Sequence, residues 1–531
     1  MPGGLREAYR MDVVIGLDTG TTSTKAVAAG LDGEVRAMAG AGYPLLVPGS
    51  GRAELDPECL RTAAVEALRE VAGQVRERGD TVLAVCLSAA MHGLVPLGAD
   101  GRPLGPLITW ADGRAAAQST ALVADGRGKA LQARTGTPVH PMSPLAKLAW
   151  WRDEDAGLLR AAARWGGVKD VVAAALCGPA VPLDLSSAST TGLYDIHARR
   201  WDAEALDIAG LTVGQLPEVV PTTHRLPPLL PEVVSATGLP AGVPVIVGAA
   251  DGPLANLGLG AVAPGVAAVS VGTSGALRTV VDGPRADDAG RLFCFALTED
   301  MWVLGGAVNN GGSVVRWAAQ AFSAGSSLHG EQADDLDAEL LAEAAEVAAG
   351  SDGLLCLPYL LGERAPWWRA GLRGAYLGLR REHRRAHLVR AAVEGVCQQL
   401  ALVGEGLAAA GVELTDVRAT GGAVESPLWV ATLAATLDHP VRTTASPEGT
   451  AVGACLLGLH ALGALPDLAA AADIVRIGEP VTPEPGDAAL YRRLRPLVER
   501  SALAIADVLT DLDKLAPGRV PATEKAVEAA G

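Results

Sequence analysis

The sequence predicts an α/β protein whose two similar halves meet at a central seam. The chain has 531 residues, which is too long for a single hydrophobic core. A strand–turn–strand pattern with a Gly-Thr turn occurs near the start, at Gly20-Thr21, and again after the middle, at Gly272-Thr273. Between these turns, a short apolar strand ends just before Asp251, the one acid in residues 243–260. These three observations predict the fold class.

Composition excludes several kinds of protein. The formal net charge of −16 argues against binding to nucleic acid. It does not argue against binding a nucleotide, which requires only a small local site. The seven cysteines form no CxxC pair, which predicts a reducing compartment and no zinc site. The first residues lack the apolar core of a signal peptide, and the most apolar tract, 257–272, is interrupted by Gly and Pro. We therefore expect a cytoplasmic protein that binds no membrane; its oligomeric state stays open, with a homodimer as one option.

The first half opens with a predicted hairpin. Residues 11–17 and 26–31 form two apolar strands, and a turn at 32–33 follows the second. Small and polar residues fill the bend between the strands, where backbone N–H groups and hydroxyls can point at phosphate oxygens. An ordinary Thr/Gly-rich hairpin is the alternative. The residues at this bend are Asp18, Gly20, Thr21, Thr22, Ser23 and Lys25.

A possible sugar pocket follows this hairpin. After a helix at 57–78 and a buried strand at 82–88, Met91 and His92 lie just past the end of the strand, where α/β proteins place ligands. A single His is more often a structural hydrogen-bonding residue. Residues 106–114 contain Trp110, Asp112 and Arg114, and the last two share a face if a strand continues through them. They could hold sugar hydroxyls with Trp110 as a wall, or form an ion pair beside a core Trp.

The approach to the seam is expected to hold a turn leading into a helix over 140–151 and a helix at 169–178. A polar loop at 184–193 and a Pro/Gly-rich stretch at 217–243 follow. At the seam, burying the Asp251 carboxylate is costly unless it is paired or takes part in chemistry. We interpret Asp251 as a catalytic base. The alternative is that it caps the helix that starts at Pro253.

The second half repeats the opening pattern. The strand 265–271 leads through Gly272 and Thr273 into another strand, so that two Gly-Thr hairpins would hold a phosphate chain from both sides. Later, paired glycines precede Ser426, which is expected to cap a helix and to let a ligand approach the backbone. The other elements expected here are a strand, turn and helix start at 304–317, a strand and loop at 354–368, and helices at 383–407, 427–437, 452–462 and 491–509.

Four motifs resemble the FGGY family of carbohydrate kinases in order and spacing: DTGTTSTK (18–25), ADG (250–252), GTSG (272–275) and TGGAVESP (420–427). The resemblance covers roughly residues 12–505. It implies two actin-like, RNase H-like domains with a cleft between them, and transfer of the ATP γ-phosphate to a sugar or polyol hydroxyl. The implied domains are 12–252, with the sugar site and first phosphate hairpin, and 253–510, with the nucleotide site; 1–11 and 511–531 are expected to be tails.

Further motifs resemble the gluconokinase branch: HPMSPLAKLAW, STTGL, GGAVNNGG and PYLLGERAPWW. MHG and a WxDGR-like segment also occur in xylulokinases, which are the alternative within the family. An actin- or Hsp70-like ATPase and a non-catalytic sugar sensor are the alternatives from other classes. Gluconate would bring a carboxylate, for which Arg114 and Arg364 are the candidate partners.

The resemblance also implies roles for single residues. Asp251 would be the base on the sugar hydroxyl and, with Asp18 acting through water, would hold Mg²⁺. Ser426 stands where many members carry Asn, which leaves the contact to the base of the nucleotide open. The implied ATP-binding residues are Asp18, Gly20, Thr21, Thr22, Ser23, Lys25, Gly272, Thr273, Gly312, Gly422, Ala423 and Ser426. The implied substrate-binding residues are Met91, His92, Trp110, Asp112, Arg114, Asp251 and Asn310.

Overall fold

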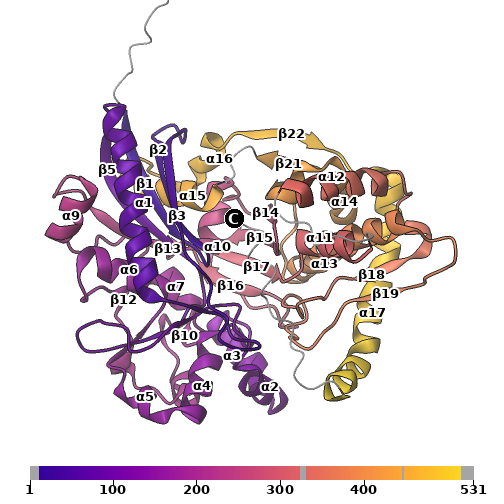
Figure 1. Ribbon diagram of the computed structural model, residues 1–531, viewed down its shortest axis with the longest axis horizontal. Helices are drawn as coiled ribbons and strands as arrows, with labels where there is room; N and C mark the ends of the chain where they lie inside the picture. Colours follow the sequence, from indigo (N-terminus) through magenta and orange to yellow (C-terminus); the bar gives the residue numbers. More distant parts are fainter. Residues whose placement is uncertain (1–10, 323–330, 445–447, 516–531) are drawn as a thin grey trace, which may run out of the picture.

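The computed structural model describes residues 11–322, 331–444 and 448–515. The described chain forms two main sheets, one of five strands and one of seven, each with helices packed on it (Figure 1). The residues of the two expected tails that lie at 1–10 and 516–531 fall outside the described residues. Within the described part, no helix has both the length and the apolar character needed to span a bilayer.

The first sheet has the strand order β13-β5-β1-β2-β3. The strands β1 (Asp12–Thr19), β2 (Ser23–Gly30) and β3 (Val35–Gly42) form an antiparallel meander, as the apolar runs and the turn at Gly33 predict. The strands β5 (Thr81–Ala89) and β13 (Val245–Ala250) then add in parallel beside β1. Their carboxyl ends therefore meet at one edge, directly before Met91 and Asp251.

The second sheet repeats this order. The hairpin of β14 (Val266–Val271) and β15 (Gly275–Val281) continues into β17 (Trp302–Val308), and β20 (Asp416–Thr420) and β21 (Val441–Thr444) add in parallel beside β14. The duplication inferred from the two Gly-Thr turns is confirmed. The edge strands β16 (Phe293–Ala296) and β22 (Ile477–Val481) complete the order β16-β17-β15-β14-β20-β21-β22.

One face of the first sheet is covered by a helix whose start is fixed by its sequence. The helix α1 (Pro57–Glu77) begins with Pro at its first position, and the Asp56 side chain accepts the N–H of Glu58 at 2.9 Å. Its buried residues recur at helical spacing and pack on the sheet together with α6 (Val168–Cys177) and α9 (Pro231–Thr237).

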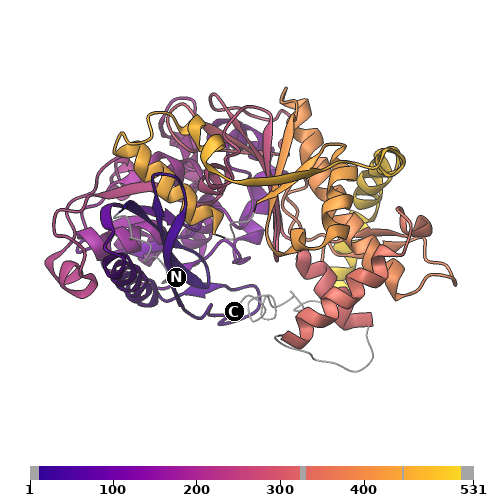
Figure 2. The ribbon, with the colours of Figure 1, turned by 90° about the horizontal axis from the view of Figure 1, so that it is seen from above.

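The opposite face of the first sheet is covered by two helices from different parts of the chain. The helix α10 (Asp251–Gly258) follows β13 directly, whereas α15 (Gly449–Ala461) comes after the second sheet in sequence. In both ribbon views the orange α15 lies against the indigo strands (Figures 1 and 2). The Cys455 thiol lies 3.2 Å from the carbonyl oxygens of Val14 and Val27. The chain therefore crosses back over the seam after β21.

The second sheet has its core on the side of α13 (Arg385–Ala409) and α14 (Pro427–Leu437). The buried stripe along α13 confirms the prediction that its apolar face is core. The remaining helices of this half are α11 (Gly312–Phe322), α12 (Glu331–Ala345), α16 (Ala471–Ile474) and α17 (Pro485–Leu515), and the remaining strands are β18 (Leu355–Leu357) and β19 (Ala375–Leu377).

A smaller group of elements lies between β4 and β12 and flanks the first sheet. Its helices are α2 (Ala116–Ala124), α3 (Arg127–Thr135), α4 (Pro144–Glu154), α5 (Ala156–Ala161), α7 (Leu185–Ser189) and α8 (Ala203–Ala209). Its strands are β4 (Glu54–Leu55), β6 (Val95–Leu97), β7 (Leu107–Ile108), β8 (Arg164–Gly166), β9 (Leu183–Asp184), β10 (Tyr194–Asp195), β11 (Arg200–Trp201) and β12 (Val219–Val220).

Three local predictions are wrong. The expected loop at 184–193 contains the helix α7, because Asp184 caps it by accepting the N–H of Ser187 at 2.8 Å. The strand through residues 106–114 ends at Ile108, so Asp112 and Arg114 lie in a turn. The closing helix is longer than 491–509 and runs over Pro485–Leu515, past the point where a tail was expected.

Candidate active site

Asp251 lies at the edge where the parallel strands of the first sheet end. It is the first residue of α10, and backbone hydrogen bonds from Gly252, at 2.8 Å, and from Met91 hold its carboxylate. Removal from water raises its pKa, while the positive charge of Arg278 acts in the opposite direction. Asp251 is not the capping residue, because Ala250 occupies that position. Its carboxylate does accept an N–H from the first turn of α10, so it interacts with the helix N-terminus as well as lying at the seam.

Asp18 stands beside Asp251 at the end of β1. The hydroxyl of Ser88 donates to its Oδ1 at 2.6 Å. Burial raises the pKa of Asp18 to about 7, and the negative charges of Asp251 and Glu448 add to this rise. Lys25 opposes it, but its Nζ is already paired with Glu448 at 2.9 Å. The predicted phosphate-turn residue Lys25 thus reaches across to the start of α15.

The acidic groups at this place suit a hydrated cation. In the part of the chain that the structure describes, no three His, Cys, Asp or Glu side chains are close enough to hold a metal ion by themselves. The excess negative charge of Asp18 and Asp251 would nevertheless be relieved by Mg²⁺, which keeps several waters and binds through one or two carboxylates together with substrate phosphates. The residues present therefore fit that ion.

The first hairpin turn is held from two sides. The N–H of Gly20 donates to the Ser23 carbonyl at 2.9 Å, and the Tyr43 hydroxyl donates to the Gly20 carbonyl at 2.9 Å. The indole N–H of Trp110 donates to the Thr21 hydroxyl at 2.9 Å. This bond ties the phosphate turn to the predicted wall of the sugar pocket.

The second hairpin turn rests on the turn before α11. The N–H of Gly312 donates to the Gly272 carbonyl at 2.7 Å, and the Ser313 hydroxyl donates to the Thr273 carbonyl at 2.7 Å. Gly272 and Thr273 themselves are exposed. A Cβ added at Gly272 or Gly422 would meet no atom within 4 Å, so the backbone is open at both places. Ala423 lies in a short 3-10 helix, and Ser426 occupies the cap position of α14 without the expected side-chain cap bond.

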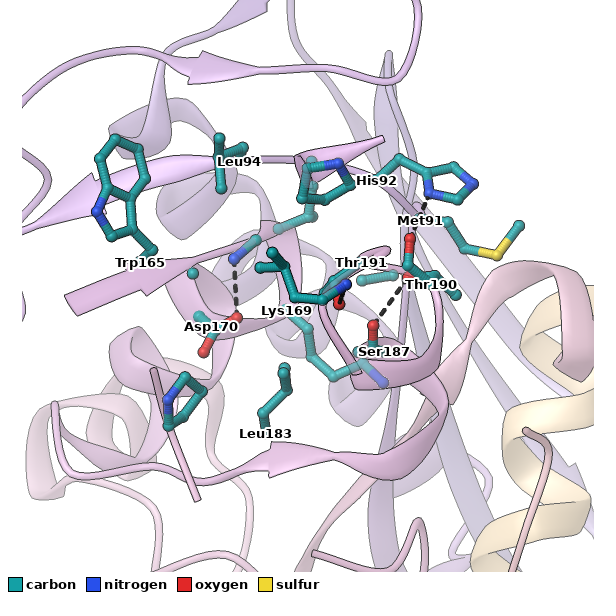
Figure 3. A pocket seen from close by; sticks show the side chains of 18 of the residues that line it. Met91, His92, Leu94, Trp165, Lys169, Asp170, Leu183, Ser187, Thr190 and Thr191 are labelled. Atoms are coloured by element: carbon teal, nitrogen blue, oxygen red, sulfur yellow. Dashed lines mark hydrogen bonds between the residues drawn. The ribbon is translucent and has the colours of Figure 1, made fainter. Parts of the chain in front are cut away.

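The turn after β5 presents His92 in a strained backbone conformation. Its φ is 64°, and its Nδ1 lies 2.8 Å from the Thr190 carbonyl oxygen, so Nδ1 carries the hydrogen. Burial lowers the pKa of His92 to about 3. The buried Lys147 ammonium donates to the His92 carbonyl at 2.6 Å. Figure 3 shows Met91 and His92 at one end of a cavity of about 50 Å³ whose other end is formed by Trp165.

Asp112 and Arg114 form a buried ion pair. The Arg114 guanidinium donates to both oxygens of Asp112, each at 2.8 Å, and also to Glu54. It stacks 5.1 Å from the centre of the Trp150 ring. The structural alternative for this pair is confirmed, with Trp150 rather than Trp110 as the neighbouring aromatic. Arg114 is thus neutralised by protein carboxylates, which leaves Arg364 as the candidate partner for a substrate acid.

Glu363 organises the loop that carries Arg364. This fully buried carboxylate accepts the N–H groups of Asn309, at 2.6 Å, and Arg364, at 2.8 Å, and the amide of Asn310 at 3.0 Å. Burial raises its pKa to about 7. Asn310 also donates to the Gly362 carbonyl at 2.8 Å, so its side-chain amide N–H groups form hydrogen bonds within this loop. The Arg364 guanidinium stacks 4.9 Å from the centre of the Trp110 ring.

Two residues that the sequence reasoning missed lie in the same place. Arg278 on β15 and His140 before α4 are both buried, and charge interactions link Arg278 to Asp251 and Arg364, and His140 to Arg364. Within the described residues, the Nε atoms of Arg278 and Arg364 and the Nε2 of His140 have no hydrogen-bond partner. Arg278 could have been found by the signal that revealed Asp251, because it is a lone charge in an apolar strand.

Family models match most of the chain. The model described as the N-terminal domain of the FGGY family of carbohydrate kinases matches residues 13–258, and that of the C-terminal domain matches residues 267–462. The chain belongs to the FGGY family of carbohydrate kinases. It is therefore an enzyme of carbohydrate metabolism, as its motifs predict.

Individual members of the family differ in how similar their sequences are to this chain. The gluconokinase of Bacillus subtilis (strain 168) is 38% identical over 487 residues, covering 91% of this chain and 94% of its own. The xylulose kinase of the same bacterium is 28% identical over 454 residues, covering 85% and 89%. Among solved structures, the gluconate kinase and the ligand-bound xylulose kinase of Lactobacillus acidophilus have TM-scores of 0.89 and 0.88. Each is 32% identical and covers 94% of this chain and 100% of its own, and these matches confirm the fold of two actin-like domains.

Proposed function

We propose that this FGGY kinase is a gluconokinase, which transfers the γ-phosphate of ATP to the 6-hydroxyl of D-gluconate. The observation that carries the proposal is the buried Arg364 beside Trp110, because its guanidinium has an unpartnered Nε at the substrate side of the seam. A carboxylate is the matching ligand for a guanidinium. The higher identity to a gluconokinase than to a xylulose kinase supports the same choice.

In the proposed reaction, Asp251 accepts the proton of the sugar hydroxyl while the hydroxyl oxygen attacks the γ-phosphorus and ADP leaves. A carboxylate in this role contributes roughly 10²–10⁴ in rate. Its partial burial favours the reaction because the raised pKa makes it a stronger base. The fixed hydrogen bonds from Gly252 and Met91 keep it in one orientation.

The two hairpins hold the triphosphate between them. Phosphoryl transfer passes through a loose transition state, so the protein mainly positions groups and neutralises charge. The turns at Gly20–Ser23 and Gly272–Thr273 would do so with backbone N–H groups that are already oriented. Mg²⁺, held by Asp18 through water and by Asp251, would supply neutralisation of the phosphate oxygens. Gly312, Gly422, Ala423 and Ser426 would lie along the nucleotide.

Closure of the cleft is expected to precede transfer, because water is a rival nucleophile. We therefore expect slow ATP hydrolysis without sugar. A cytoplasmic location, where ATP is available, suits the seven cysteines, all of which are free thiols.

A coupled assay of ATP consumption with D-gluconate, xylulose, glycerol and ribulose tests the proposal. The expected result is much higher kcat/KM with D-gluconate than with the other three. A preference for xylulose would replace gluconokinase by the xylulokinase alternative. Fast hydrolysis that no sugar changes would indicate an ATPase whose purpose is a conformational change.

A further inference from the structure

Arg278 reaches the seam from the second sheet. It lies on β15, and its Nη1 is 3.7 Å from the position that a Cβ on Gly252 would take. The Cε of Met91 is 2.8 Å from the same position. The guanidinium therefore lies beside the first turn of α10, next to the residue after Asp251 and the predicted substrate-binding Met91.

Arg278 lacks the partner that other buried arginines have. Arg390, Arg418 and Arg495 are 7–8% exposed and pair with Glu394, Asp416 and Glu405 at 2.8, 3.4 and 3.1 Å. Among the described residues, Arg278 and Arg364 are equally buried, at 7% and 9%, and neither has a carboxylate within 4.0 Å. The nearest polar side-chain partner of Arg278 is the Ser270 hydroxyl, at 3.3 Å.

An unpaired buried charge is costly, and here two such charges face each other. Burial lowers the pKa of both arginines to about 10, and each guanidinium repels the other. Asp251 favours both cations, and Glu363 favours the Arg364 cation more strongly. Among the described residues, no carboxylate lies within 4.0 Å of either guanidinium, so neither is occupied by a direct ion pair. Both can therefore bind the anionic group of a ligand.

The unpartnered atoms indicate the side on which this anion binds. The Nε atoms of Arg278 and Arg364 are donors that find no acceptor in the described part of the chain. Nδ1 of the neutral His140 accepts the Met142 N–H at 3.3 Å, so its unpartnered Nε2 is a donor too. Arg364 stacks on Trp110, the predicted wall of the sugar pocket, and His140 interacts with the charge of Arg364. Arg278 adjoins Met91, another predicted sugar-binding residue. The donors therefore suit the sugar substrate.

We propose that Arg278 binds the carboxylate of an acidic sugar substrate together with Arg364, and so makes the enzyme select sugar acids over neutral polyols. This inference rests on the proposed kinase function but not on gluconate itself. It assigns a specificity role to a strand residue that lies in the opposite half of the molecule from Met91 and Trp110. The substrate would thereby join the two halves.

The test compares D-gluconate with D-glucitol, which carries CH₂OH in place of the carboxylate. In Arg278→Met we expect kcat/KM for gluconate to fall about 10²-fold, the effect of removing one partner from a buried charge pair. The kcat/KM for glucitol should change far less, because only the effect of Arg278 on the Asp251 base is lost there, and the KM for ATP should stay unchanged. Arg278→Lys, which keeps the charge but loses the planar fork, should retain part of the preference for the acid.

Stability provides a second readout. Arg278→Met should raise the melting temperature of the ligand-free enzyme, because an unpaired buried charge is removed, and should abolish the further increase that gluconate causes in the wild type. Arg418→Met is the matched control. Arg278 and Arg418 both pair with Ala268 of β14, from opposite sides, but Arg418 donates to the Leu259 and Gly260 carbonyls. Its loss should lower the melting temperature and leave the ratio of acid to polyol activity unchanged.

The outcomes separate the two proposals. Equal losses with gluconate and glucitol in Arg278→Met, a raised KM for ATP, or a lowered melting temperature would each overturn the role of Arg278 while the wild type remained a gluconokinase. A wild type that prefers a different sugar acid, and loses that preference in Arg278→Met, would refute gluconokinase and support the role of Arg278. A wild type that prefers a neutral sugar would refute both.

Discussion

The contact between α10 and α15 is so close that one added methyl group should disturb catalysis. A Cβ at Gly453 would lie more than 1 Å inside the 3.4 Å at which ordinary contact with the Leu254 carbonyl oxygen begins. A Cβ at Gly258 would overlap the Gly449 carbonyl in the same way. In Gly453→Ala the two helices must therefore separate by about 1 Å or more.

This separation would act on both stability and rate. Overpacking a well-packed interior costs about 1–3 kcal/mol of unfolding free energy. Because α10 begins at Asp251, the displacement would also move the proposed base relative to the sugar hydroxyl. A misplacement of about 1 Å costs about 10²-fold in rate. We expect Gly453→Ala to lose about 10²-fold in kcat/KM and to melt at a lower temperature.

The assay is coupled ATP consumption with gluconate, together with thermal melting and calorimetric ATP binding. Gly73→Ala in α1 is the control, because the nearest atom to its added Cβ is the end of the Arg76 side chain, at 3.9 Å. That change should stabilise the protein by about 0.5–1 kcal/mol, since Ala is the better helix former, and should leave the rate unchanged. Wild-type kcat/KM in Gly453→Ala would refute the argument that this helix contact positions Asp251.

Three further predictions follow from single side chains. Asp251→Asn should lower kcat about 10²–10⁴-fold while calorimetry still detects ATP binding; wild-type turnover would remove Asp251 from the mechanism. Asp112→Asn should cost about 1.5–3 kcal/mol of unfolding free energy in denaturant titrations, because Arg114 loses one of its two buried carboxylates and keeps Glu54; a change below 1 kcal/mol would contradict this. The pKa of His92 and His140 is lowered to about 3, so the unfolded chain takes up protons below about pH 6.5 that the folded chain does not, and stability should fall as the pH drops from 6.5 towards 3. His140→Asn should make that slope shallower by up to about 1.4 kcal/mol per pH unit, and an unchanged slope would show that His140 titrates normally in the folded state.

Local sequence signals predicted the repeated part of this fold. The hairpins around Gly20-Thr21 and Gly272-Thr273 are fixed by apolar strands and by turn residues a few positions apart, so they can be recognised without knowing what packs on them. The isolated Asp251 is a comparable signal, because a single acid in an apolar stretch requires an explanation wherever that stretch lies in the fold.

The residues that surround the site are brought together by contacts between parts of the chain that are far apart in sequence. Glu54 reaches Arg114, Glu448 reaches Lys25, and α15 returns to cover the first sheet, over separations that local pattern cannot encode. The same limit explains why residues 106–114 were expected to continue as a strand.

The sequence by itself determined the two-fold repeat, the family and the place of the proposed base, because each depends on residues within a short stretch. Only the tertiary structure decided which charges are left without partners. Arg114 and Arg364 are equivalent candidates in the sequence, yet folding gives Arg114 two carboxylates in direct ion pairs, whereas Arg364 has no described carboxylate within 4.0 Å and lies near a second guanidinium. The physical reason is that a charge is neutralised by what lies within a few ångströms of it, and the fold alone sets those neighbours.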